Sequence, residues 1–111
     1  MKNLIATVVL TLAAVPCFAN DQLEAWGAGS STCSRYLDDY DSNFKAAMLN
    51  DVSWALGFLT AENKRRVSSK AHLLHYAEPE KITAYLVKYC KENQFSTLYQ
   101  GVVALSNDLA K

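Results

Sequence analysis

The chain has 111 residues, half of them hydrophobic, and its eleven Lys and Arg balance eleven Asp and Glu, so the formal net charge at pH 7 is zero. This balance provides no basic field for nucleic acid, which argues against a nucleic-acid-binding protein. The length suits one domain, and a domain of about ninety residues buries only about two thirds of its unfolded surface, so cross-links help it to stay folded.

Residues 1–19 have the features of a secretory signal peptide. A basic residue, Lys2, precedes an apolar stretch, and small side chains stand before a cleavage point ahead of Asn20. The apolar stretch is too short to anchor the chain in a bilayer. We therefore predict export to the periplasm, no membrane insertion after leader removal, and a single mature helical domain over residues 20–111. The alternative is a lipidated Cys17, which the proline directly before it disfavours.

Cleavage of the leader removes one of three cysteines and leaves Cys33 and Cys90. Two cysteines in a chain exported to an oxidising compartment are best explained as a disulfide pair. Closing a loop of this length should raise the free energy of unfolding by about 4 kcal/mol, a large share of the ~5–15 kcal/mol that is usual for a domain. The alternative, a free reactive thiol, needs a setting that lowers the thiol pKa, and no neighbouring residue supplies one.

Four segments have helical periodicity and none alternates as a strand does, so we predict an all-α domain, a small bundle of about four helices. The first helical segment covers residues 21–26 and again 31–40, interrupted by two glycines, and its longer part starts at Ser31 or Thr32. Its inward face has helical spacing and consists of Cys33, Tyr36, Leu37 and Tyr40.

The second segment is apolar over much of its circumference, and we predict that it is the central helix. One apolar stripe consists of Phe44, Met48, Val52, Ala55 and Leu59, and a second of Trp54, Phe58 and Ala61. The helix begins near Phe44, or at a cap on Asn50 or Asp51, and ends near Asn63. The basic residues 64–69 that follow are predicted to form an exposed loop.

The third helix has Pro79 at its first position, acidic residues around it and lysines in its last turns, as helix ends favour. Its inner face consists of Ile82, Tyr85, Leu86, Tyr89 and Cys90, which turns Cys90 toward Cys33. Ser96 is predicted to cap a fourth helix. The apolar face of that helix consists of Leu98, Val102, Leu105 and Leu109.

Few residues combine into a pattern that carries chemistry. His72, His75 and Glu78 are spaced by three, as zinc ligands on one side of a helix are, but Pro79 disfavours a helix there and a fourth ligand is missing. A cluster of acidic residues is predicted to be a solvated loop rather than a cation site: Asp38, Asp39 and Asp41. We find no serine elbow, phosphate-binding glycine loop, catalytic carboxylate pair or Cys/His pair. We therefore predict no enzyme activity, metal or cofactor.

Two stretches of the mature chain resemble the HdeA/HdeB family of periplasmic acid-stress chaperones. They are residues 32–37 (TCSRYL), around the first cysteine, and residues 89–93 (YCKEN), around the second. Gln94 stands where that family has a proline. Further similarity to the HdeB end of the family lies in residues 97–99 and 106–109.

The resemblance implies that Cys33 and Cys90 are the family's disulfide pair and that the protein is an ATP-independent holdase. Such a protein is a folded, inactive homodimer near neutral pH, exposes apolar surface in acid and binds unfolded periplasmic proteins. Protonation of the eleven mature carboxylates would leave the ten Lys and Arg, two His and the new amino terminus, about thirteen positive charges, uncompensated. The candidate apolar surface for clients or for the dimer is Trp54, Phe58 and Leu59.

Two other functions fit a small, secreted, disulfide-bonded helical protein. The first is a periplasmic immunity protein that inhibits a cell-wall amidase delivered by a rival bacterium through type VI secretion. It predicts one tight partner, whereas a holdase predicts many weak clients in acid. The second is an envelope protein with another binding role.

Overall fold

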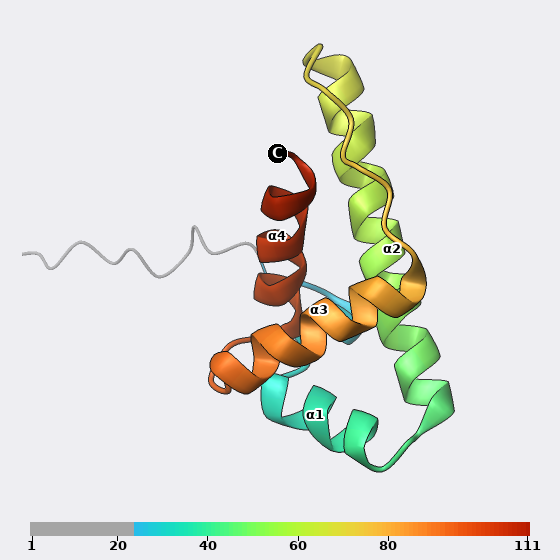
Figure 1. The fold of residues 1–111 in the computed structure, drawn as a ribbon, viewed down its shortest axis with the longest axis vertical. Coiled ribbons are helices and arrows are strands. Elements are labelled where there is room, and N and C mark those ends of the chain that lie inside the picture. The colour runs from blue at the N-terminus through green and yellow to red at the C-terminus, as the bar shows by residue number, and fades with distance from the viewer. Residues whose placement is uncertain (1–23) are drawn as a thin grey trace, which may run out of the picture.

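A computed structural model describes residues 24–111 of the chain, so the predicted leader at residues 1–19 and the cleavage site lie outside the described residues. The described part is all-α, as predicted, with one short 3-10 helix and four α-helices (Figure 1). In chain order these are η1 (Gly27–Ser30), α1 (Cys33–Asp41), α2 (Lys45–Ser68), α3 (Pro79–Glu92) and α4 (Leu98–Leu109).

The longest helix, α2, contacts every other element, which confirms it as the central helix. In Figure 1, α4 lies beside α2, α3 crosses in front of them and α1 lies beneath α3. The apolar faces predicted for α3 and α4 meet in the core, where the largest fully buried side chains are Ile82, Leu86, Leu98, Val102, Cys33 and Cys90. No helix of residues 24–111 is long and apolar enough to cross a membrane.

The start of α1 is set by Thr32, whose hydroxyl oxygen accepts a hydrogen bond from the Arg35 amide, the usual role of an N-cap. Within the described part of the first predicted segment, residues 24–26 are not helical, so that part of the prediction is wrong. The cause is Gly27, whose φ of 70° turns the chain before a helix can form. Gly29, which follows, has no room for a side chain, because the ring of Trp54 occupies that space.

The second helix begins at Lys45, in agreement with the start near Phe44 rather than a cap at Asn50 or Asp51. Its predicted end near Asn63 is wrong, since α2 continues to Ser68.

Most of the predicted loop at residues 64–69 is therefore helical. Two ion pairs explain the extension, because Glu62 contacts both Arg65 and Arg66, which stand three and four residues further along the same helix. The helix ends where Lys70 adopts a φ of 57° and the Ala71 amide donates back to the Arg66 carbonyl, a common left-handed helix ending.

After α2 the chain returns along the same helix as an extended segment (Figure 1). Leu74 is buried there, and its amide donates to the Asn63 side-chain oxygen at 2.8 Å. The His75 amide donates to the Leu109 carbonyl at 2.8 Å. These bonds fix the returning segment against α2 and α4.

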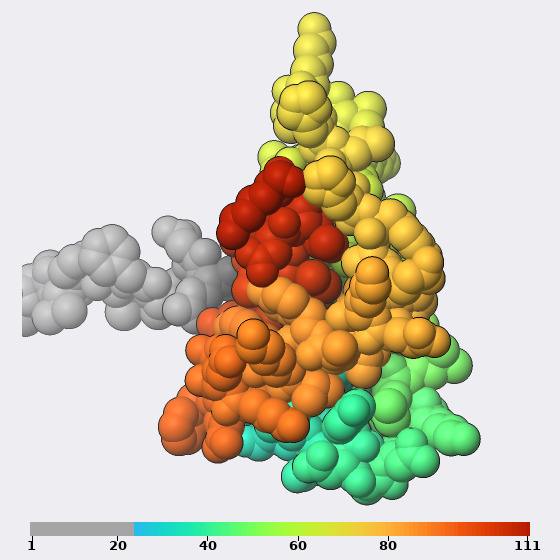
Figure 2. All heavy atoms as spheres, in the orientation of Figure 1, coloured from blue at the N-terminus to red at the C-terminus, as the bar shows by residue number. Residues whose placement is uncertain are grey.

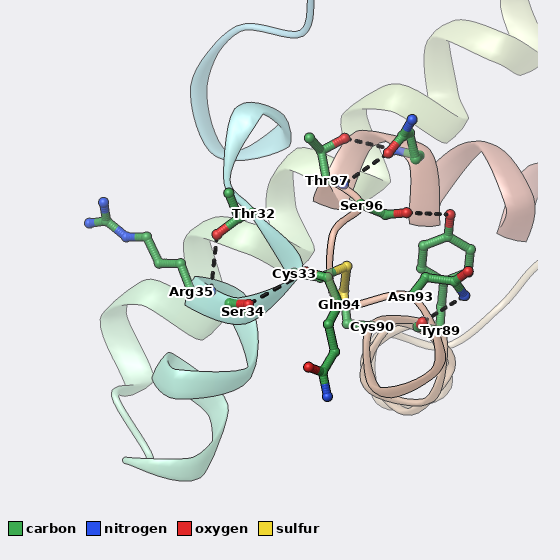
Figure 3. The surroundings of a disulfide bond; sticks show 11 residues. Thr32, Cys33, Ser34, Arg35, Tyr89, Cys90, Asn93, Gln94, Ser96 and Thr97 are labelled. Atoms are coloured by element: carbon green, nitrogen blue, oxygen red, sulfur yellow. Dashed lines mark hydrogen bonds between the residues drawn. A yellow bond between two sulfur atoms is a disulfide. The ribbon is translucent and has the colours of Figure 1, made fainter.

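The fourth helix is capped by Thr97, so the prediction of Ser96 as its cap is wrong by one residue. The Thr97 hydroxyl accepts from the Gln100 amide, and the Gln100 side chain accepts from the Thr97 amide. This reciprocal pair satisfies two amides that a helix start leaves without partners. The Ser96 hydroxyl faces the Tyr89 hydroxyl instead (Figure 3).

Candidate functional site

The predicted disulfide joins Cys33, the first residue of α1, to Cys90 near the end of α3 (Figure 3). Their Cα atoms lie 4.9 Å apart and both side chains are fully buried. The bridge is confirmed, and the alternative of a free thiol is wrong for both cysteines. Beside it, the Ser34 hydroxyl donates to the carbonyl of Gln94 at 3.4 Å.

Two backbone hydrogen bonds cross the same region. The Cys33 amide donates to the Ser96 carbonyl at 2.8 Å, and the Leu98 amide donates to the Ser31 carbonyl at 2.9 Å. The bridge and these bonds tie the start of α1 to the end of α3 and the start of α4. We call this region the disulfide base, residues 31–36 and 86–98.

The three residues predicted as an apolar client or dimer surface lie on α2 but do not form an open patch. Leu59 is a buried core residue, and Trp54 and Phe58 are half-buried. The Trp54 and Phe58 rings stack with centroids 5.8 Å apart, and Tyr99 of α4 packs edge-on against both. The Trp54 indole N–H also donates to the Trp26 carbonyl at 2.8 Å. The chain itself thus covers much of this cluster.

Three of the eight large apolar side chains that are exposed in residues 24–111 lie where α1 ends and α2 begins. Phe44 is 57% exposed, Leu49 66% and Tyr40 39%, although Phe44 and Tyr40 were predicted on inward helix faces. Only the ends of these two faces are exposed, where Asn43, with φ 55°, redirects the chain between the helices, whereas Tyr36 and Ala55 further along them are buried. We call this region the acidic corner, and it consists of Asp38, Asp39, Tyr40, Asp41, Phe44 and Leu49.

The acidic cluster predicted as a loop belongs to the last turns of α1, so that assignment is corrected. A run of carboxylates that satisfies helical spacing can stay helical when the helix is anchored elsewhere, here by the buried Cys33 and Tyr36. Carboxylates and exposed apolar side chains therefore lie on either side of one short turn, where the Phe44 amide donates to the Asp39 carbonyl at 3.0 Å. The sequence contained both groups, but only the turn between the helices brings them together.

A carboxylate that the sequence did not single out lies under this corner. Asp51 is only 6% exposed, and burial raises its pKa to about 6, with a smaller contribution from the negative charge of Asp39 and an opposing one from Arg35. Burial and the charge of Asp51 in turn raise the pKa of Tyr36. Asp51 therefore loses its charge in weakly acidic solution.

The opposite end of α2 has a different character. We call residues 63–77 the α2 tip; they comprise the last turns of the helix and most of the returning segment. Arg66 donates to the carbonyl of His72 at 3.1 Å, which ties the two halves of the tip together. Val67, Leu73 and Tyr76 are exposed. In Figures 1 and 2 this yellow end extends beyond the red end of α4.

The three residues that have the spacing of zinc ligands, His72, His75 and Glu78, do not lie on one side of a helix. His72 and His75 lie on the extended segment, and the His75 ring nitrogen lies 2.9 Å from the Lys111 carbonyl oxygen. In the described part of the chain no group of three His, Cys, Asp or Glu is placed to hold a metal ion. A surface hollow of about 430 Å³ between η1 and α4 has two ionisable lining residues, Glu24 and Tyr99, and its lining residues include no nucleophile paired with a base.

Comparison with family models, with curated proteins and with solved structures found no match to this chain. The resemblance to the HdeA/HdeB family therefore stays a prediction.

Proposed function

We propose that the protein is a periplasmic, ATP-independent holdase that acts in acid and without catalysis. The observation that carries this proposal is the acidic corner, where exposed Phe44 and Leu49 follow the three aspartates of α1 across one short turn. Ionised carboxylates keep such a surface hydrated near neutral pH. Loss of their negative charge in acid would leave the exposed apolar side chains without charged neighbours of that sign, which favours binding of unfolded chains.

Two features support retention of the fold under the same conditions. A carboxylate with a raised pKa destabilises the folded state when it is ionised, so the burial of Asp51 costs stability above about pH 6 and costs none once it is protonated. The Cys33–Cys90 bridge does not titrate and limits expansion of the chain at any pH. In this proposal acid changes the surface of the domain more than its interior.

We further propose that a second copy of the chain covers part of the exposed apolar surface near neutral pH. A small monomer rarely leaves several large apolar side chains exposed. Loss of this homodimer in acid, driven by the repulsion of about thirteen positive charges per chain, would free the corner for clients.

The test is suppression of aggregation of a mixed periplasmic extract by the purified, oxidised protein at pH 7 and at pH 2 to 5, with oligomeric state followed alongside. We expect protection only in acid, lost in a Phe44→Ser/Leu49→Ser variant and kept in a matched Val67→Ser/Leu73→Ser variant. Phe44 precedes α2, where serine is a good cap, so the first variant should fold. Equal protection by all three proteins would contradict a role for the corner, and no protection would contradict the holdase.

A second candidate is the immunity protein that blocks a cell-wall amidase. All three ion pairs of residues 24–111 join residues within one helix or at its end. These residues therefore contain no ion pair between helices that acid could break to change the arrangement of the helices. The lack of such a switch favours a binder that works at neutral pH. This candidate predicts nanomolar binding to one purified amidase at pH 7, measured by calorimetry, and inhibition of its hydrolysis of peptidoglycan. Absence of binding to a panel of secreted amidases would argue against it.

A further inference from the structure

Positive charge in the described chain is concentrated at the α2 tip. Residues 24–111 contain ten Lys and Arg, and four of them lie within the tip, which contains both histidines and no Asp or Glu. The remainder of residues 24–111 has six Lys and Arg against ten Asp and Glu. One end of the molecule is therefore basic while the rest is acidic, so a negatively charged surface would attract the tip and repel the body.

The tip has a fixed shape without any partner. Leu74 anchors it in the core, and the Leu74 amide bond to Asn63 and the Arg66 bond to His72 join its two halves. Figure 2 shows the end of α2 and the start of the returning segment as a projection beyond the neighbouring helices. A flat surface can therefore reach the tip before it reaches the acidic body.

Apolar side chains are interspersed with the charges of the tip. Val67 is 64% exposed and Leu73 57%, whereas Tyr76 lies lower, in a hollow lined by Leu56 and Leu59. Lysines interspersed with exposed aliphatic side chains are typical of segments that lie at the headgroup level of a bilayer.

The hydrogen bonds and ion pairs of the basic side chains favour a lipid surface over a protein cleft as the partner of the tip. Both arginines are already engaged, Arg65 with Glu62 and Arg66 with Glu62 and His72. Lys64 and Lys70 make no side-chain hydrogen bond or ion pair with the described residues. Protein hot spots depend on arginine and buried aromatic anchors, whereas flexible lysines suit the diffuse charge of a headgroup layer.

We propose that the α2 tip docks on the surface of an anionic phospholipid bilayer. Lys64 and Lys70 would meet lipid phosphates, and Val67 and Leu73 would lie at the boundary between headgroups and acyl chains. The acidic corner, at the other end of α2, faces away from the bilayer. This attachment is peripheral and independent of the holdase proposal.

The probe is sedimentation with vesicles of phosphatidylglycerol and phosphatidylethanolamine (1:3), against pure phosphatidylcholine vesicles, at pH 7 in low and high salt. The protein is secreted from its own leader and purified in the oxidised form. We expect binding to the anionic vesicles that weakens in high salt and is absent on phosphatidylcholine. A basic side chain near such a surface contributes roughly fivefold to partitioning, so Lys64→Glu/Lys70→Glu should weaken binding by more than twentyfold.

The matched control is Lys45→Glu/Lys81→Glu, which changes the net charge equally at two helix starts away from the tip, where acidic residues are tolerated. It should bind within about twofold of the wild type. The Val67→Ser/Leu73→Ser variant should bind several-fold more weakly, and Phe44→Ser/Leu49→Ser should bind as the wild type does.

Failure of the wild type to bind anionic vesicles would overturn the proposal. Equal losses of vesicle binding in Lys64→Glu/Lys70→Glu and in Lys45→Glu/Lys81→Glu would also overturn it, because binding would then depend on net charge alone and not on the tip. If vesicle binding is absent and the tip variants instead lose binding to a protein, the tip is a protein interface and the lipid proposal is wrong.

Discussion

The disulfide base and the α2 tip are held in place by different kinds of contact. In the base, a buried bridge and two backbone hydrogen bonds join segments about sixty residues apart in the chain. In the tip, most bonds join residues within eleven positions of one another, such as Arg66 with His72 and Asn63 with Leu74. We therefore expect contacts between distant parts of the chain, in the disulfide base, to provide most of the free energy of unfolding. The α2 tip is shaped mainly by local hydrogen bonds, so changes there should affect the core little. Function that depends on surface residues can therefore change at the tip without loss of the fold.

The largest expected effect is loss of the bridge. Cys33→Ala/Cys90→Ala should lower the free energy of unfolding by about 4 kcal/mol, because the unfolded chain regains the freedom that a loop of this length removes. Urea denaturation followed by circular dichroism measures it, with reduction of the wild type as a parallel test. A loss below about 1 kcal/mol would place the stability of the domain elsewhere than in the base.

A pair of core and tip substitutions sharpens the comparison. Leu86→Ala removes a side chain that is 1% exposed, and should cost about 3 kcal/mol through lost burial and a residual cavity. Val67→Ala at the tip, where the side chain is 64% exposed, should change stability by less than about 0.5 kcal/mol. Denaturation midpoints at constant m-value give both numbers, and similar costs at the two sites would contradict the division between base and tip.

A smaller, pH-dependent effect is expected at Asp51. Its folded-state pKa of about 6 exceeds the model-compound value of 3.8, so its contribution to stability is most favourable below about pH 4 and is lost as pH rises through 6. Asp51→Asn removes this dependence. Its stability relative to the wild type should improve by roughly 1 to 3 kcal/mol between pH 4 and pH 8. A difference that stays constant over this range, in urea titrations at several pH values, would show that Asp51 has the same pKa in the folded and the unfolded chain, and would contradict the raised pKa.

The smallest effect concerns the ion pairs before the tip. The hydrogen bond and charge of Arg65, and then the charge of Arg66, lower the pKa of Glu62, so these pairs stabilise the fold above the unfolded pKa, near 4.5, and lose their effect as pH falls through the folded one. Glu62→Gln should cost less than about 1 kcal/mol at pH 7 and less still in high salt. Thermal unfolding at two salt concentrations measures this cost, and a larger loss without salt dependence would indicate a packing role for Glu62.

The sequence was sufficient to predict the helical class and the bridge because both depend on features that are regular along the chain. The spacing of Ile82, Leu86 and Cys90 identified a buried helix face. The predicted removal of the leader left two cysteines in a chain predicted to be exported, and this identified the disulfide pair. The end of α2 was missed because the polarity of residues 64–69 was weighed above their helix-forming side chains and the pairing of Glu62 with Arg65.

The candidate site was harder to predict, because it depends on how helices are placed rather than on their periodicity. Trp54 and Phe58 are apolar in sequence whether they face solvent or Tyr99, and only the position of α4 decides between these. Phe44 was expected inward because it has helical spacing with Met48, but the turn at Asn43 brings it to the surface. Burial of Asp51 likewise has no local signal in the sequence.

The position of the bridge within the chain also bears on synthesis and export. Cys33 needs Cys90 and the Ser96 carbonyl, and the Ser31 carbonyl needs the Leu98 amide, so α1 cannot dock until nearly the whole chain has been made. The docking of α1 therefore waits for the last fifth of the chain. In the predicted export, α1 would dock only after the C-terminal end of the chain has emerged from the secretion channel.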